Sequence, residues 1–380
     1  MRILYVAMKY DYGNPSAGCS FEHWNFFHPL SEMGFDLIYF DFLSIMQQRG
    51  RDAMNRRLWE VAEVERPDVM FVVLFQDQLD QRVVRRISDE LDTVTMNWFC
   101  DDHWRFDNYS HSWAPCFNWV VTTARSALPK YERIGYVNVI KSQWAANHFL
   151  YRPSDLPPAW DVTFVGRPHG DRREYIAALR DAGIHVQCWG ETFEKGRLTQ
   201  QEMVDVFGRS RINLNLSNAS SAGDVPSQSP LRRRLAALPW PGPIRRLGTR
   251  VLDRGHRPAR VSAGTDRKML PEQIKGRNFE VPGCAGFLLS GHADDLDRYY
   301  RIGEEVACFE SRTDLIEKIR YYLAHDEKRQ AIAQAGYRRT IAQHTWAHRF
   351  HEVFGTAGLD PPPLDELVRR RPGGTVLEIE

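Results

Sequence analysis

The stretch DVTFVGRPHGDRREYIAAL, residues 161–179, begins a second series of alternating apolar runs and amphipathic segments, after a first series earlier in the chain. Its apolar run, Asp161–Gly166, predicts a buried strand, and a turn containing proline and glycine separates it from an amphipathic helix predicted over Arg172–Ala182. A strand followed by a helix is the repeating unit of a parallel sheet with helices on both faces. Because this unit recurs on both sides of the stretch, we expect two doubly wound α/β domains.

Apolar runs alternate with amphipathic segments ahead of this stretch. Runs that are continuously apolar predict strands buried on both faces. The predicted strands are Ile3–Ala7, Asp36–Phe40, Val69–Phe75, Thr93–Phe99, Trp119–Thr123 and Val137–Ile140, and the predicted helices are Phe21–Met33, Asp52–Glu65, Leu79–Leu91 and Arg125–Ile134. RPSDLPPAW, Arg152–Trp160, carries three prolines, which resist helix formation and predict a hinge between the domains.

The alternation continues after the stretch. The predicted strands are Ile184–Trp189, Ile212–Ser217 and Gly286–Leu289, and the predicted helices are Thr199–Gly208, Asp314–Ala324, Glu327–Gln343 and Thr345–Phe354. We therefore assign residues 1–155 to an N-terminal Rossmann-like domain and residues 160–355 to a C-terminal Rossmann-like domain, with a tail at 356–380. Such sheets bind ligands at the carboxyl ends of their strands, so two of them facing each other predict a cleft with a small-molecule site.

An insertion at 218–269 interrupts the second domain. Its residues 229–268 contain ten Arg and one Lys against two Asp. The segment is either a solvated surface or a docking site for an acidic partner or an anionic membrane surface, and the pattern leaves both readings open.

Composition narrows the classes of function. The 380 residues carry a net charge of +1, so no overall field attracts nucleic acid. No apolar run approaches the roughly 18–20 residues of a membrane span. The six cysteines show neither zinc-ligand spacing nor a disulfide framework, and the first residues read as a strand rather than a signal peptide. We expect a cytoplasmic protein.

KGRNFEVPGCAGFLLS, Lys275–Ser290, combines charge with a turn before a buried strand. A loop that leads into a helix facing a cleft is an anion site, because free N–H groups and the helix dipole favour negative charge. Lys275 and Arg277 suit a diphosphate, and Glu280 could accept hydrogen bonds from ribose hydroxyls. An ordinary helix with solvated charges is the alternative.

WFCDDHW, residues 98–104, begins where a predicted strand ends. We expect Asp101, Asp102 and His103 to face the cleft, where a carboxylate could act as general base on an acceptor hydroxyl. The alternative is an Asp-rich cap that starts the next segment.

Several of these motifs together resemble the CgeB-like, spore-maturation-type glycosyltransferases, relatives of the family 4 glycosyltransferases with the GT-B fold. The similarity lies in QIKGRNFEVPGCAGFLLS, in the paired helices ending in AGYRRTIAQHTWAHRF, in NWFCDDHWRFDNYS, in IGYVNVIKSQWAAN and in DVTFVGRPHGDRREYIAAL. It covers most of residues 90–350 except the Arg-rich insertion.

The resemblance implies roles for individual positions. Glu280 matches the second glutamate of an E-x7-E pattern, which contacts the ribose, and Glu272 stands where the first contacts the transferred sugar. The residues between them lack the family's Gly-Phe-Gly run, and Pro282 also departs from the pattern. Gly166 would let the donor phosphate approach the backbone, with Arg167 and Arg172 as its cations opposite Lys275 and Arg277. The relatives place a His or Asp against the sugar at positions 101–103.

The predicted function is therefore a glycosyltransferase of the GT-B fold that moves a sugar from a nucleotide-diphosphate donor, with a UDP-sugar favoured, to an unidentified acceptor. No DxD motif of the metal-binding kind stands out, and we expect no metal or other cofactor, because cations can stabilise the departing diphosphate. A non-catalytic nucleotide-sugar-binding or scaffold protein and a nucleotide-sugar epimerase are the alternatives, since one fold hosts many functions.

Overall fold

A computed structural model describes residues 1–217, 272–370 and 374–379. The predicted Arg-rich insertion at 218–269 lies outside the described residues. Within them the chain forms two parallel sheets, as the alternation of apolar runs and helical segments predicts.

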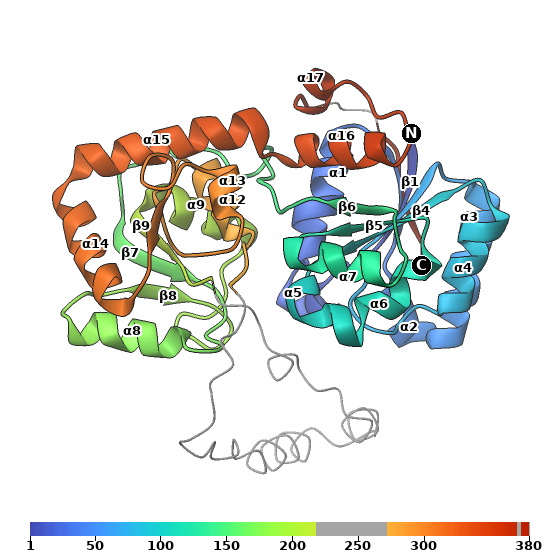
Figure 1. Ribbon diagram of the computed structural model, residues 1–380, viewed down its shortest axis with the longest axis horizontal. Coiled ribbons are helices and arrows are strands. Elements are labelled where there is room, and N and C mark those ends of the chain that lie inside the picture. The colour runs from blue at the N-terminus through green and yellow to red at the C-terminus, as the bar shows by residue number, and fades with distance from the viewer. Residues whose placement is uncertain (218–271, 371–373, 380) are drawn as a thin grey trace, which may run out of the picture. The chain divides into compact units, whose positions relative to one another are not determined.

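The first sheet has seven strands in the order β12-β2-β1-β3-β4-β5-β6. Figure 1 labels β1, β4, β5 and β6 of this sheet. All of its neighbouring strands run parallel; Ile3, for example, lies opposite Leu37 of one neighbour and Val69 of the other. The strands are β1 (Arg2–Val6), β2 (Asp36–Phe40), β3 (Val69–Val72), β4 (Val94–Phe99), β5 (Trp119–Thr122), β6 (Val139–Lys141) and β12 (Val376–Ile379).

Helices bury both faces of this sheet. Leu4 and Val6 of β1 share a core with Met54 and Leu58, whereas Ile3 and the other alternate residues belong to a second core. This division follows from the two-residue period of a strand. The helices of this part are α1 (His28–Glu32), α2 (Phe42–Arg49), α3 (Arg51–Glu65), α4 (Gln81–Glu90), α5 (Asp102–Arg105), α6 (Ser110–Trp113) and α7 (Leu128–Arg133), with a π-helical turn at His23–Phe27.

That π-helical turn lies in the helix predicted over Phe21–Met33. Pro29 stands in the first turn of α1, where the missing N–H of proline is tolerated. The predicted helix therefore runs unbroken from Phe21 to Glu32 with a π-helical turn inside it, and such turns are frequent at functional sites. The turn carries Trp24 and Asn25, which line the cavity described below.

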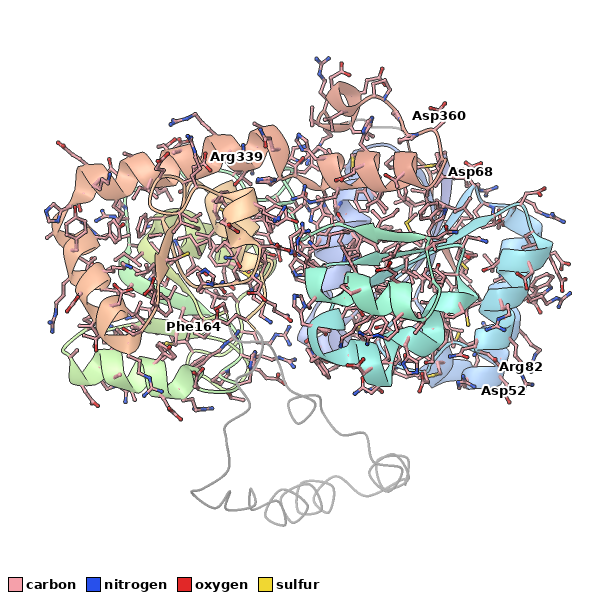
Figure 2. The ribbon with its side chains drawn as sticks, in the orientation of Figure 1. Asp52, Asp68, Arg82, Phe164, Arg339 and Asp360 are labelled. Atoms are coloured by element: carbon pink, nitrogen blue, oxygen red, sulfur yellow. The ribbon has the colours of Figure 1, made fainter. Side chains whose placement is uncertain are left out.

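The second sheet has five parallel strands in the order β11-β10-β9-β7-β8. Phe164 of β7, labelled in Figure 2, is buried in the core of this part. The strands are β7 (Trp160–Val165), β8 (Gln187–Trp189), β9 (Ser210–Asn215), β10 (Leu288–Gly291) and β11 (Ala307–Phe309). The helices are α8 (Arg172–Asp181), α9 (Gln200–Arg209), α12 (Arg277–Gly283), α13 (Leu296–Tyr299), α14 (Arg312–Ala324) and α15 (Asp326–Gln343).

The chain then returns to the first sheet. In α16 (Trp346–Thr356), Trp346 packs on Phe26 and Trp98, with ring centroids 4.6 and 5.5 Å apart. After α17 (Leu364–Leu367), strand β12 pairs with the outer edge of β2. From the sequence, these last residues were assigned to the second domain and to a tail. The domain boundaries stay predictions. In the structure, residues from 346 onward pack with the first sheet.

Candidate active site

A cavity of about 660 Å³ lies at the carboxyl ends of strands from both sheets. One wall comes from residues 11–25, which follow β1. The other comes from the loops after β7 and β8, the start of α9 and the first residue of α12. Among the described lining residues are Asp11, Tyr12, Phe21, Trp24, Asn25, Gly166, Arg167, Gly190, Glu191, Arg197, Gln200 and Arg277.

The second wall depends on two glycines. The backbone N–H of Gly166 donates to the carbonyl of Trp189 at 3.0 Å, so the ends of β7 and β8 lie close together. Gly190 follows Trp189 with φ +150°, and a Cβ there would lie 2.1 Å from the carbonyl oxygen of Gly166. Only glycine fits at position 190. Gly166 lines the cavity, and a Cβ there would lie 3.1 Å from the ring of Phe164.

Arg167 lies where the sequence predicts it, on the cavity wall. Its guanidinium donates to the hydroxyl of Tyr12 at 3.0 Å and packs 4.7 Å from the centre of that ring. It also forms ion pairs with Glu191 at 3.2 Å and Asp11 at 3.8 Å. This arginine therefore connects residues that follow β1, β7 and β8.

Arg172 is buried behind the same loop. Its guanidinium donates to the carbonyl oxygens of Arg167 at 2.9 Å and Leu216 at 2.7 Å. These bonds join the end of β7 to the end of β9. Arg172 is thus placed to hold the Gly166–Arg167 loop in shape, and it is not among the lining residues.

Arg277 and Glu280 form a pair one helical turn apart on α12. The Glu280 side chain is fully buried, and one of its oxygens accepts from the Arg277 guanidinium. The other oxygen accepts from Tyr151 at 3.1 Å and from Asn25 at 3.4 Å. Arg277 reaches the cavity, whereas Glu280 lies behind it with its oxygens occupied by protein groups, so the predicted ribose contact of Glu280 would require this network to rearrange.

Lys275 is a partly buried lysine just before α12. Burial lowers its pKa from about 10.5 to about 7, a shift that the nearby carboxylate of Asp101 opposes and the charge of Arg172 reinforces. Within the described residues, no hydrogen bond or ion pair reaches its ammonium group. A desolvated cation in this state is suited to an anionic ligand.

The three residues that follow β4 do not all lie in the same place. Asp101 and His103 lie near Lys275. The charge of Asp101 acts on Lys275, and the charge of Lys275 acts on His103. Burial lowers the pKa of His103 to about 4, so its ring is neutral near pH 7, and its Nδ1 has no partner among the described groups.

The position of Asp102 differs from the one expected from the sequence. Only 1% of this residue is exposed, and its carboxylate accepts from the Tyr131 hydroxyl at 2.7 Å. Burial raises its pKa to about 6. The prediction that it faces the cleft is wrong, because α5 begins at this residue and its side chain turns into the core beside Tyr131.

Glu272 lies apart from the cavity lining. Its carboxylate is 3.6 Å from Nδ1 of His292, and burial raises its pKa. The structure therefore brings Gly166, Arg167 and Arg277 together at the cavity, places Lys275, Asp101 and His103 near one another, and leaves the roles of Glu272, Glu280 and Arg172 as predictions.

Three charged residues of the site were not predicted. Arg197 lines the cavity and pairs with Asp11 at 2.5 Å. Glu22 lies in the first turn after Ser20, whose hydroxyl caps that turn by accepting from the His23 N–H at 3.1 Å. The polar residues following β1, in KYDYGNPSAGCSFE, were the available signal for Asp11 and Glu22, whereas Arg197 sits in a loop without any motif.

Glu22 is the most perturbed of these carboxyl groups. Burial raises its pKa from about 4.5 to about 7, and the neighbouring charges of Asp11 and Asp101 add to the increase. The charges of the cavity residue Asp11 and of Asp101 therefore both act on Glu22. A carboxyl group that titrates near neutrality is suited to general acid–base work.

Comparisons with known proteins agree with this architecture. A family model described as glycosyl transferase-like matches residues 252–355. The spore protein CgeB of Bacillus subtilis is 19% identical over 238 residues, which is 60% of this chain and 64% of that protein, slightly less than two thirds of its length.

Solved structures show the fold. Anabaena HepE in complex with UDP and glucose superposes with a TM-score of 0.60 at 11% identity, covering 94% of this chain and 99% of that one. A glycosyltransferase from Rickettsia africae gives 0.59 at 9% identity, covering 94% and 97%. Sucrose-phosphate synthase from Thermosynechococcus elongatus gives 0.56 at 10% identity, covering 94% and 97%.

These findings confirm the GT-B fold and the resemblance to CgeB-like glycosyltransferases, and the family match supports a glycosyltransferase. In the part of the chain that the structure describes, no helix is both long enough and apolar enough to cross a membrane.

Proposed function

We propose that this CgeB-like glycosyltransferase of the GT-B fold transfers a sugar from a nucleoside-diphosphate donor, bound in the arginine-lined cavity, to an acceptor hydroxyl. The observation that carries the proposal is the meeting of Arg167, Arg277 and Gly166 on one cavity wall. Guanidinium groups bind phosphate oxygens in pairs, and a glycine lets the phosphate approach the main chain. A UDP-sugar is the favoured donor, because the structural neighbour HepE is in complex with UDP and glucose.

The chemical demand is the charge that develops on the departing diphosphate. Arg277 and Lys275 flank the start of α12, and both would face that charge. Preorganised cations in a partly desolvated site stabilise such a leaving group strongly. This supply of positive charge supports transfer without a divalent cation.

The acceptor side carries the groups that could move a proton. Asp101 remains the proposed base among the predicted residues, since Asp102 is bonded to Tyr131 in the core. His103 is neutral near pH 7 and has an unpartnered ring nitrogen, which suits a hydrogen bond to a sugar hydroxyl rather than a charge contact.

The proposal is tested by a thermal-shift screen of UDP, GDP, dTDP and ADP, with and without their sugars, followed by calorimetry on the nucleotide that stabilises the protein. A ligand at 100 times its Kd raises the free energy of unfolding by about 2.7 kcal/mol. Arg277→Ala and Lys275→Ala should each weaken the affinity. Arg211→Ala is the matched control, because Arg211 pairs with Asp161 and Asp326 away from the cavity lining.

Stabilisation by none of these nucleotides would contradict the proposed function. Equal affinity in the wild type and both site variants would contradict this placement of the diphosphate. Incubation of the bound sugar nucleotide with candidate acceptors then separates transfer from binding without turnover.

A further inference from the structure

The charged residues of the cavity neutralise one another. Of the described lining residues, Arg167, Arg197 and Arg277 are cationic and Asp11 and Glu191 are anionic. Each arginine has a carboxylate partner: Arg167 pairs with Glu191 and Asp11, Arg197 with Asp11, and Arg277 with Glu280. A diphosphate entering this cavity therefore meets cations that already hold carboxylates.

These carboxylates differ in how firmly they are held. Glu280 is fully buried and also accepts from Tyr151 and Asn25, so it cannot leave Arg277 without losing several bonds. Glu191 lies on the loop after β8, its side chain is 57% exposed, and among the described residues its ion-pair partner is Arg167. Asp11 is different, because one of its oxygens lies between two guanidinium groups, 2.5 Å from Arg197 and 3.8 Å from Arg167.

The loop after β1 is built to place Asp11 there. An antiparallel bridge between Tyr10 and Cys19 closes the loop, and the Asp11 N–H donates to the Gly18 carbonyl at 3.0 Å. The next residue, Tyr12, has φ +50° and ψ +30°, a left-handed conformation that costs a non-glycine residue of order 1–3 kcal/mol. The Tyr12 hydroxyl accepts a hydrogen bond from Arg167, so the strained residue and its acidic neighbour bind the same guanidinium.

We propose, on the basis of the function proposed above, that Arg197 is a further diphosphate-binding residue of the donor site and that Asp11 occupies its anion-binding position in the donor-free protein. A carboxylate and a phosphate offer similar oxygen pairs to a guanidinium, and the phosphate carries the greater charge. Binding of the donor then exchanges the Asp11 carboxylate for a phosphate, and the freed carboxylate moves into water.

The exchange predicts opposite effects for two substitutions. Arg197→Ala should weaken UDP binding about tenfold or more, because it removes a charge-assisted hydrogen-bond donor. Asp11→Asn should strengthen UDP binding about threefold or more, because it removes the competing anion while preserving the side-chain shape. Neither substitution should change the binding of uridine, which has no phosphate.

Calorimetric titration of the full chain with UDP and with uridine measures these effects, and circular dichroism melting verifies that each variant is folded. Arg211→Ala serves again as the control, since it removes an arginine that holds two carboxylates elsewhere in the second sheet's domain. In the double variant the gain from Asp11→Asn should disappear, because its effect depends on Arg197.

The outcomes separate the two proposals. If the wild type binds UDP and Arg277→Ala weakens that binding, while Arg197→Ala and Asp11→Asn leave it unchanged, the proposed function stands and this inference is overturned. Weaker UDP binding by Asp11→Asn also overturns it, because Asp11 would then be a ligand rather than a competitor. If the wild type binds neither UDP nor any other nucleoside diphosphate, both proposals fail.

Discussion

At the scale of single residues, Lys275 differs from the arginines around it. The arginines near the cavity are paired with carboxylates, whereas the Lys275 ammonium has no partner among the described groups and has a pKa of about 7. Arginine remains charged under nearly all conditions, but a buried lysine can lose its proton. Lys275 is therefore a cation near this site whose charge depends on pH.

This state predicts a pH dependence of donor binding. Burial lowers the pKa of Lys275 to about 7, so the residue is mostly charged below that pH and mostly neutral above it. UDP affinity should therefore fall as the pH rises from 6 to 9, and binding near pH 7 should take up a proton. Calorimetry in buffers of different ionisation enthalpy measures both effects. In Lys275→Met the proton uptake should vanish, and its persistence would assign the uptake to another group.

Glu22 gives a prediction for stability. Its pKa of about 7 in the folded protein lies above its ordinary value of about 4.5, so folding favours the protonated form. The stability that this group contributes is fully present below about pH 4.5 and is lost as the pH rises through about 7. Glu22→Gln removes this loss, and between pH 4.5 and pH 8 the variant should gain roughly 3 kcal/mol relative to the wild type.

Urea unfolding at these two pH values measures the difference for Glu22→Gln. Glu352→Gln, at an exposed position of α16, is the control and should follow the wild type at both. A Glu22→Gln variant that also followed the wild type would show that Glu22 is ionised in the folded protein throughout this range.

The Arg277–Glu280 pair has an exposed counterpart with the same spacing. Removing one partner of a buried pair leaves an uncompensated charge, so Glu280→Gln should lower the free energy of unfolding by about 3–5 kcal/mol. It should also weaken UDP binding, because Arg277 loses the group that orients it. In the exposed Arg57–Glu60 pair, Glu60→Gln should change stability by less than about 0.5 kcal/mol. Urea unfolding of both variants makes the comparison, and similar small losses would contradict the importance of the buried network.

At the scale of elements, α16 anchors the returning chain to the first sheet. Phe350 is fully buried and packs against Phe71 of β3, Phe354 and Trp346, with ring centroids 5.8, 5.5 and 5.6 Å away. Phe350→Ala should therefore cost about 3–5 kcal/mol of stability, measured by urea unfolding. Glu352→Ala, at an exposed position of the same helix, should cost little. A small loss for Phe350→Ala would mean that α16 contributes little to the core of the first sheet.

At the scale of the whole molecule, the sequence predicts the repeated strand–helix units well, because buried parallel strands form continuous apolar runs. Asp36–Phe40 is reproduced residue for residue, and the strand restarting at 161 begins one residue earlier than predicted. Strand β12 was missed because Val376, Leu377 and Glu378 lie exposed at an edge, where no apolar run is required.

From the sequence, residues of the site could be predicted only where they directly follow a predicted strand. Gly166 and Arg167 follow β7 directly and line the cavity, and their roles in donor binding stay predictions. The sequence of a short helix does not reveal which way each side chain points. The buried Asp102 could therefore not be distinguished from Asp101. Long-range pairing is equally hidden, and the contact between Arg197 and Asp11 joins residues separated by most of the first domain.

The pairing of β12 with β2 also bears on how the protein is made. While the ribosome is still synthesising the chain, the outer edge of β2 has no neighbour, and it remains open until residues 376–379 emerge. At ribosomal rates this wait is of the order of tens of seconds. An unpaired strand edge invites association with other chains, so nascent copies of this protein should depend on chaperones until their last strand is complete.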